Sequence, residues 1–274
     1  MLIRTISGAV LLALSFLFIY LGGYPLGGIL TVLSMAAYYE LTKALVDKYK
    51  EKKILVGFGY VAIALMYAGL LLSDNMLYPV MAVVLSIILF LCIYVFWFPK
   101  YNAEDVMSVI MSFVYAPVLF TFVYLTRNME GGIYLVWMIY ICSWGYDTFA
   151  YLVGMTTGKL FGNHKFVPVL SPKKSIEGLI GGIAAAFILG FCYSRFFAGA
   201  HLGLEGKDFV MGIIGAVGAL IAQTGDLAAS AIKRNKNIKD YGKCIPGHGG
   251  IMDRFDSMVF TAPIIYFLAA LLIK

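Results

Sequence analysis

Long apolar segments alternate with short polar ones along the chain. Nine apolar windows follow one another, each close to the roughly 17 to 25 residues that a helix needs to cross the hydrocarbon core of a bilayer. They cover approximately residues 3–22, 26–46, 54–73, 76–98, 106–126, 132–154, 176–198, 208–231 and 257–273. The pattern predicts an all-α, polytopic integral membrane protein with nine transmembrane helices.

The composition agrees with this pattern. Hydrophobic residues make up 61% of the chain and charged residues 13%, against about 25% charged residues in ordinary soluble domains. The gaps between the windows are too short for a separate soluble domain. Chemistry must therefore lie on the membrane helices and on the two longest polar segments, residues 155–175 and 232–256. We expect N-terminal transmembrane helices over residues 1–130 and a catalytic C-terminal region over residues 131–274.

Basic residues give the expected orientation, because short loops rich in Lys and Arg stay in the cytoplasm. With the N-terminus inside, nine crossings place all but four of the 21 basic residues on the cytoplasmic side. The four outer residues are Arg127, Arg195, Lys207 and Lys274. We expect a protein of the inner (cytoplasmic) membrane whose two polar loops face the cytoplasm. No small-residue cleavage site follows the first apolar run, so we expect that run to be retained.

The net charge of +6 follows largely from this asymmetry and suits attraction to anionic lipid headgroups. It does not indicate nucleic-acid binding, and we expect no nucleic-acid partner.

Four acidic residues lie in or beside the apolar windows, where a charge is unfavourable unless it faces a cavity or a partner. They are Glu40, Asp147, Glu177 and Asp226, all toward the cytoplasmic half in the expected topology. Glu177 opens a helix after a serine that can cap it, and Glu40 has Lys43 three residues later, so structural roles are open for both. Asp147 and Asp226 have no basic neighbour within a helical turn. We expect their partner to be a metal ion or another helix.

The first polar loop combines lysines and hydroxyls before the start of a helix. It contains Lys159, Lys165, Lys173, Lys174, Ser171 and Ser175. Free amides and the helix dipole attract phosphate at such a position, so the loop predicts an anion site. The alternative is an ordinary helix cap with lysines that only fix the topology.

The second polar loop carries more chemistry. Five basic residues precede the sequence PGHGG, whose glycines let backbone amides approach an oxyanion. Asp253 and Asp256 follow, and they share one helix face if the last helix begins there. These acids with Asp226 suit Mg²⁺, which takes carboxylate oxygens together with substrate phosphates. The set is typical of phosphoryl or nucleotidyl transfer. Neither a P-loop nor an HExxH motif occurs.

The run SAIKRNKNIKDYGKCIPGHGGIMDRFD, from Ser230 to Asp256, closely resembles the signature of the phosphatidate cytidylyltransferases, also called CDP-diacylglycerol synthases. That signature combines a serine, a Lys-Arg pair, Lys-Asp, a small residue, Pro-x-His-Gly-Gly, Asp-Arg and a final Asp. The matching residues are Ser230, Lys233, Arg234, Lys239, Asp240, Gly242, Pro246, His248, Gly249, Gly250, Asp253, Arg254 and Asp256. Upstream, DTFAYLVGMTTGK and SPKKSIEG are similar to that family's second polar region. The first five windows match only in being hydrophobic.

The resemblance implies a reaction of phospholipid biosynthesis in which CTP and phosphatidic acid give CDP-diacylglycerol and pyrophosphate, with Mg²⁺ as cofactor. It implies metal ligation by Asp226 and Asp253, with Asp256 as a third ligand or as a carboxylate that orients a neighbour. His248 would donate to a phosphate or act as an acid. The catalytic set would comprise Asp226, Asp253, Asp256, His248 and Lys233. The substrate-binding set would comprise Lys174, Ser171, Ser230, Arg234, Lys239, Gly249, Gly250, Arg254 and, in the same cavity, Asp147.

A secondary transporter is the main alternative from another class, because intramembrane acids also mark ion pathways. It predicts internal repeats and acids on both sides of the midplane, whereas the sequence has no clear repeat and its charged cluster is one-sided. A second alternative is a related enzyme for a different lipid, such as an archaeal-type CDP-lipid synthase or a polyprenol kinase. Small residues between Gly178 and Gly190 permit close helix packing within one chain or in a homodimer, which is the alternative we favour.

Overall fold

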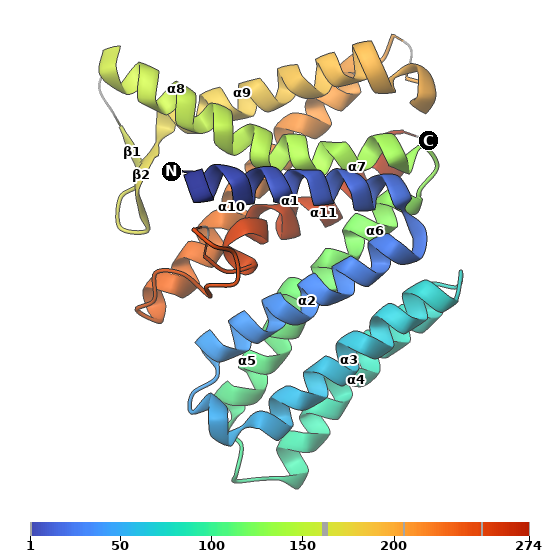
Figure 1. The fold of residues 1–274 in the computed structure, drawn as a ribbon, viewed down its shortest axis with the longest axis vertical. Coiled ribbons are helices and arrows are strands. Elements are labelled where there is room, and N and C mark those ends of the chain that lie inside the picture. The colour runs from blue at the N-terminus through green and yellow to red at the C-terminus, as the bar shows by residue number, and fades with distance from the viewer. Residues whose placement is uncertain (1, 161–163, 205, 248, 274) are drawn as a thin grey trace. The chain divides into compact units, whose positions relative to one another are not determined.

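The computed structural model describes residues 2–160, 164–204, 206–247 and 249–273, and most of them are helical (Figure 1). The first helices are α1 (Leu2–Leu21), α2 (Gly23–Leu45), α3 (Lys53–Leu72) and α4 (Leu77–Phe96), with a short turn η1 (Tyr49–Glu51). Helix α5 (Ala103–Phe113) continues through the π-helical turn η2 (Val114–Val118) into α6 (Leu119–Asn128).

The later helices carry the polar loops. Helix α7 (Gly132–Tyr140) continues through the π-helical turn η3 (Ile141–Gly145) into α8 (Tyr146–Leu160). A hairpin of β1 (Lys165–Val167) and β2 (Ser171–Ser175) leads into α9 (Ile176–Tyr193), which ends in the turns η4 (Ser194–Ala198) and η5 (Ala200–Leu202). Helices α10 (Asp208–Asn235) and α11 (Met252–Leu272) complete the chain.

The helical runs confirm the predicted all-α membrane class. Within the described residues, six runs are long and apolar enough to cross a membrane: α3, α4, Ala103–Asn128, Ile176–Ala198, α10 and α11. The predicted count of nine crossings is not confirmed, because α1, α2 and the α7–α8 run are not among these six. Crossing by those three runs stays a prediction.

The chain divides into two compact units. The first contains Met1–Tyr124 and Ile238–Arg254, and the second contains Leu125–Asn237 and Phe255–Lys274. The boundary therefore passes through the first turn of α11. This division rests on packing, and the functional division at residue 130 stays a prediction.

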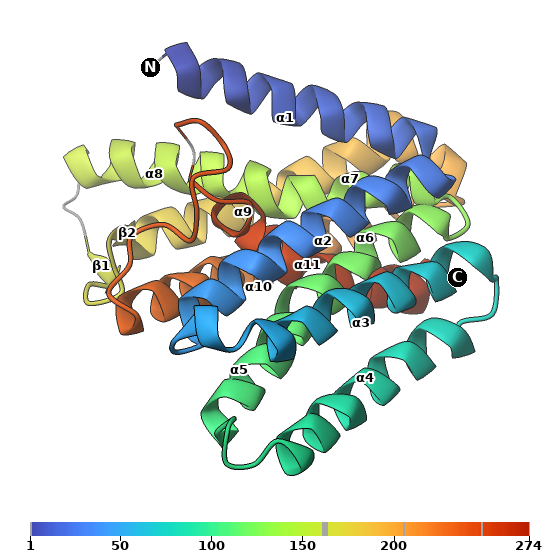
Figure 2. The ribbon, with the colours of Figure 1, turned by 60° about the horizontal axis from the view of Figure 1, so that its bottom comes forward.

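In the first unit, α3 and α4 lie side by side, and α2 packs on α3 and α5 (Figures 1 and 2). The buried Tyr38 on α2 donates a hydrogen bond from its hydroxyl to the Val56 carbonyl oxygen at 3.1 Å. On the same helix, the Ser34 hydroxyl lies 2.8 Å from the Tyr67 hydroxyl of α3. These buried polar contacts fix α2, the helix that carries Glu40.

In the second unit, α9 packs closely against α8 and α10 (Figures 1 and 2). A methyl group at Gly178 of α9 would lie 2.7 Å from the Ala150 carbonyl oxygen of α8, and one at Gly154 would lie 2.9 Å from the Ser175 hydroxyl. On the other side, a methyl group at Gly215 of α10 would overlap the Ala186 carbonyl of α9. The small residues of α9 therefore serve packing within the chain, and the homodimer stays a prediction.

Candidate functional site

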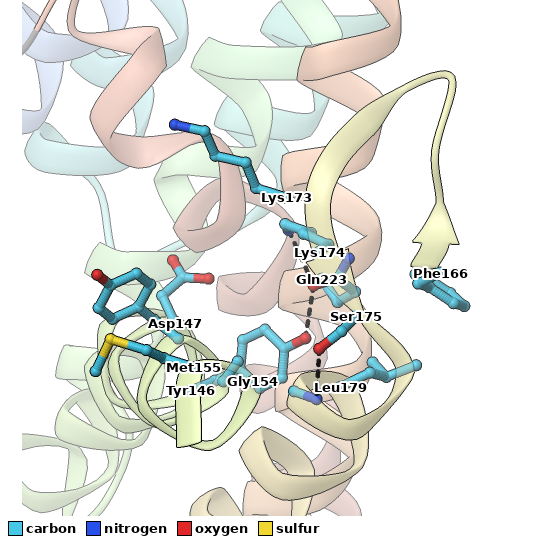
Figure 3. A pocket seen from close by; sticks show the side chains of 13 residues that line it. Tyr146, Asp147, Gly154, Met155, Phe166, Lys173, Lys174, Ser175, Leu179 and Gln223 are labelled. Atoms are coloured by element: carbon cyan, nitrogen blue, oxygen red, sulfur yellow. Dashed lines mark hydrogen bonds between the residues drawn. The ribbon is translucent and has the colours of Figure 1, made fainter. Parts of the chain in front are cut away.

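A polar cluster lies on one face of α10 in the second unit (Figure 3). Lys174, in β2, forms an ion pair with Asp226, and its ammonium also donates to the Gln223 Oε1 at 2.9 Å. The Tyr146 hydroxyl donates to the same oxygen at 2.5 Å. Gln223 and Asp226 share a helix face because they are three residues apart. The ion-pair partner of Asp226 is thus a lysine of the hairpin strand β2, whereas the expected protein partner was another helix.

This ion pair is open to competing anions. The side chains of Lys174 and Asp226 are 24% and 26% exposed, so water reaches both charges. A partly exposed pair is worth little by itself, about 0 to 1 kcal/mol. The ammonium can therefore exchange its carboxylate partner for a phosphate at small cost in stability.

A cavity of about 270 Å³ lies beside the cluster, between α8, β2, α9 and α10 (Figure 3). Its polar lining includes Asp147, Lys173, Lys174 and Gln223. Ala150, Met155, Phe166 and Leu179 form its apolar wall. The structure therefore brings two predicted substrate-binding residues, Asp147 and Lys174, to one cavity. The π-helical turn η3 ends directly before Tyr146 and Asp147, and such turns are frequent at functional sites.

Asp256 lies close to Asp226 in the same unit. A methyl group at Gly225 of α10 would lie 2.8 Å from the Asp256 carbonyl oxygen of α11, so the two helices touch there. Asp256 is 8% exposed and accepts a hydrogen bond from the Ser257 N–H at 2.8 Å. Asp226, Lys233 and Asp147 are within electrostatic range of its carboxylate. The structure thus gathers four of the predicted site residues around α10.

The carboxylates of this unit can contribute to a magnesium site. Among the described residues, no three His, Cys, Asp or Glu side chains come together closely enough to hold a metal ion. Mg²⁺ usually binds one or two carboxylates and completes its shell with water and substrate phosphates. The neighbouring Asp226 and Asp256 fit that donor set.

In the first unit, Asp253 organises the glycine-rich loop. Its Oδ2 accepts hydrogen bonds from the N–H groups of Tyr241 at 2.8 Å and Gly250 at 3.0 Å. Gly249 has φ +87°, a left-handed conformation that favours glycine, and a methyl group there would lie 3.0 Å from the same oxygen. Helix α11 begins at Met252, as the prediction for the two aspartates of this stretch requires. Asp253 therefore shapes the loop as well as supplying a carboxylate.

Glu40 caps the start of α11 from a distant part of the chain. This carboxylate is 1% exposed and accepts hydrogen bonds from the N–H groups of Ile251 at 3.0 Å and Met252 at 2.9 Å. A side chain at Gly242 or Gly250 would overlap it, which explains both glycines of the loop. The free amides at a helix start favour such an anion.

The alternative that Glu40 pairs with Lys43 is wrong for the described residues. Lys43 instead places its ammonium 5.4 Å from the centre of the Tyr39 ring. The acid is held by the amides of α11, so its role is structural through a contact that the local sequence does not show.

A second cavity, of about 700 Å³, lies in the loop of the first unit. The predicted phosphate-binding residues Lys239, Gly249 and Arg254 line it, together with Lys243 and Asp240. Three basic side chains and one acidic side chain line the cavity, so its positive charge favours binding of a polyanion. Gly250 is buried and does not line this cavity, and the predicted donor His248 lies outside the described residues.

Three other predicted residues lie apart from both cavities. Ser171 begins β2 and pairs with Val167 in the hairpin. Ser230 is half-buried and Arg234 is exposed near the end of α10. The expected cap is confirmed, since the Ser175 hydroxyl accepts from the Gly178 N–H at 3.1 Å.

Sequence reasoning missed Gln223 and Tyr146. Gln223 is a polar residue in an apolar helix, three positions before Asp226, and that spacing was an available signal. The only signal for Tyr146 in the sequence was its position next to Asp147. The role of an uncharged polar side chain depends on its hydrogen-bond partners, which the sequence does not show.

Comparisons with known proteins identify the family of the chain. The chain matches the family described as "Cytidylyltransferase family" over residues 2–272. It is 34% identical over 169 residues to a Staphylococcus haemolyticus protein named phosphatidate cytidylyltransferase, and 36% identical over 174 residues to one from Staphylococcus aureus with the same name. Each match covers 62% of this chain and 61% of the relative, so the chain spans about three fifths of those relatives. The match over nearly its whole length shows that the chain belongs to the cytidylyltransferase family.

Proposed function

We propose that this protein is a phosphatidate cytidylyltransferase, which converts CTP and phosphatidate into CDP-diacylglycerol and pyrophosphate. One observation carries the proposal: Lys174 of β2 forms an ion pair with Asp226 of the membrane-spanning helix α10, beside a cavity with a basic edge and an apolar wall. A phosphate attached to hydrocarbon chains suits both parts of that lining. The names of the staphylococcal relatives support the same substrate.

The reaction needs no covalent nucleophile from the protein. An oxygen of the lipid phosphate attacks the α-phosphorus of CTP, forming a new P–O bond. The bond between the α-phosphorus and the bridging oxygen breaks, and its electron pair leaves with pyrophosphate. The protein positions both reactants and stabilises negative charge, which is the usual basis of catalysis in such transfers. Lys174 and Lys233 of the second unit are placed near the carboxylates to supply that positive charge.

Mg²⁺ is the cofactor that the carboxylates favour. Asp226 and Asp256 would hold it, and Asp253 stays a predicted third ligand. When bound, the ion would neutralise phosphate charge and stabilise the leaving group. Because Lys174 already pairs with Asp226, the lysine would share that carboxylate with the metal or transfer its hydrogen bond to a phosphate.

The basic loop of the first unit supports binding of the triphosphate. Lys239, Lys243 and Arg254 line its cavity, and the glycines leave backbone amides accessible to oxyanions. His248 stays a predicted donor to the same group. The inside-positive distribution of basic residues supports a cytoplasmic orientation in the inner membrane, where CTP is available.

The experiment that tests this function measures lipid dependence. Purified protein in detergent is incubated with radiolabelled CTP and Mg²⁺, and chloroform-extractable label is counted with phosphatidate, with phosphatidylglycerol and with an archaeal-type phosphorylated lipid. The proposal expects label only with phosphatidate. Label only with the archaeal-type lipid would assign the enzyme to a different substrate.

A further inference from the structure

The side-chain amide of Gln223 is buried, and only its oxygen has hydrogen-bond partners among the described residues. The side chain is 3% exposed, and its Oε1 accepts hydrogen bonds from the Tyr146 hydroxyl at 2.5 Å and the Lys174 ammonium at 2.9 Å. Its Nε2 has no hydrogen-bond partner among the described residues. Buried donors without partners are rare in folded proteins, because each loses its hydration without compensation.

The two donors fix the direction in which this amide points. A lysine ammonium has only donors, so the atom facing Lys174 must be the amide oxygen. A flip would set the amide N–H₂ against the ammonium and against the tyrosine hydroxyl. Tyr146 and Lys174 therefore hold the Gln223 amide with its buried Nε2 unpaired among the described residues, and the residue lines the cavity (Figure 3).

The cavity selects an anion that carries hydrocarbon. Lys173 and Lys174 line it, and among the described residues Lys173 has no carboxylate partner. Tyr151 of its lining is 68% exposed, and the neighbouring helix α9 carries further exposed apolar side chains such as Ile180 at 62%. Hydrocarbon would cover the exposed apolar face of α9, since α9 with η4 is a run long and apolar enough to cross the membrane.

Two nearby carboxylates, those of Asp226 and Asp147, would repel an anion in this cavity, but the repulsion from each is reduced. Asp226 is paired with Lys174. Asp147 lines the cavity but is exposed, so water and salt screen its charge. A phosphate group in the cavity would thus be bound by Lys173, by the Lys174 ammonium that Asp226 shares, and by the Gln223 amide.

We propose that this cavity is the subsite for the phosphate monoester of the lipid substrate, and that the Gln223 Nε2 donates a hydrogen bond to one of its oxygens. Tyr146 is the positioning residue that orients the amide. The inference rests on the proposed function and assigns this site to one of its two substrates. The lipid phosphate binds Lys173, Lys174 and Gln223, whereas the triphosphate of CTP binds elsewhere.

The test separates the two substrates by KM and by direct binding. Gln223→Glu keeps the size of the side chain and its acceptor oxygen but replaces the donor with a second acceptor. Loss of a hydrogen bond to a charged group corresponds to about tenfold or more in affinity. We expect KM for dioctanoyl phosphatidate to rise by about that factor while KM for CTP changes less than about twofold. Tyr146→Phe should raise the lipid KM by a smaller factor. Gln223→Met, which removes both polar atoms, serves if the glutamate variant folds poorly.

The matched control is Thr224→Val, the next residue on α10. Its side chain is exposed, and its hydroxyl donates to the Leu220 carbonyl oxygen at 3.1 Å. This variant should leave both KM values unchanged. Equal rises in the two KM values for Gln223→Glu, or a lower melting temperature with unchanged lipid KM, would overturn the subsite.

Titration calorimetry of dioctanoyl phosphatidate without CTP gives a second readout, independent of turnover. Wild type should bind at least about tenfold more tightly than Gln223→Glu. Equal binding contradicts the subsite. A wild type that binds phosphatidate yet transfers no label contradicts the proposed function instead, so the two failures are distinguishable.

Discussion

Lys174 and Asp226 form an ion pair that joins strand β2 to the membrane-spanning helix α10, 52 residues apart in the sequence. Each residue alone has an ordinary explanation: a lysine that fixes topology and an acid in an apolar helix. Together, beside the Gln223 amide and an apolar cavity, they form an anion site that a lipid phosphate can enter. The exposure of both side chains leaves the lysine able to change partners.

Lys174→Met is therefore expected to reduce activity far more than stability. Removing one preorganised group that stabilises transition-state charge costs about 10²- to 10³-fold in kcat. The partly exposed ion pair contributes at most about 1 kcal/mol to stability. Label incorporation and thermal unfolding measure the two effects, with Lys165→Met of the hairpin as control. Comparable activity of the two variants would remove Lys174 from the site.

Asp226→Asn is expected to raise the Mg²⁺ concentration needed for half-maximal activity by at least about tenfold, because a neutral amide is a weaker ligand for a hard cation. Chelation with EDTA should abolish activity, and added Mg²⁺ should restore it. Asp74→Asn, at an exposed position between α3 and α4, is the control and should behave as wild type. An unchanged Mg²⁺ requirement in Asp226→Asn would show that this carboxylate is not a ligand.

Glu40→Ala is expected to loosen the loop before α11. One buried and one partly buried N–H group would lose their acceptor, at about 1 to 3 kcal/mol for the buried one. The free energy of unfolding should fall by that order, and trypsin should cleave faster after Lys239 and Lys243. Gly250→Ala should have a similar effect, since its methyl group would collide with Glu40. Cleavage as slow as in wild type would contradict the cap.

Cys244 reports on the same carboxylate. Desolvation of the thiol, followed by the charge and hydrogen bond of Glu40, raises the pKa of the exposed Cys244 above its usual range. Less thiolate is then present at any pH near 8, and alkylation is slow. Glu40→Gln removes the charge and lowers this pKa, so the rate of iodoacetamide labelling at pH 8, followed by peptide mass spectrometry, should rise. An equal or slower rate would show that Glu40 does not act on this thiol.

Helix positions followed from the sequence because the length of an apolar run determines whether it can cross a bilayer. The prediction for residues 208–231 thus falls inside α10. The last helix begins at Met252, five residues before the apolar run, because its first turn is polar and is held by Glu40 and Asp253. An amphipathic first turn gives no hydropathy signal.

The charged residues of the site could be predicted from the sequence, but the residues that they contact could not. The local spacing predicted that Glu40 pairs with Lys43. The Glu40 carboxylate oxygens instead accept hydrogen bonds from backbone amides more than 200 residues later in the chain. Gln223 carries no charge, and its role depends on two donors that tertiary structure brings to one oxygen. Long-range polar contacts of this kind leave no periodic trace in a sequence.

The position of the label in CTP tests cytidylyl transfer most directly. Purified protein, phosphatidate and Mg²⁺ are incubated in parallel with CTP labelled at the α-phosphorus and at the γ-phosphorus, and lipid-borne label is counted. Attack at the α-phosphorus predicts that only the α label enters lipid while the γ label leaves in pyrophosphate. Lipid carrying the γ label instead would contradict cytidylyl transfer and identify a lipid kinase.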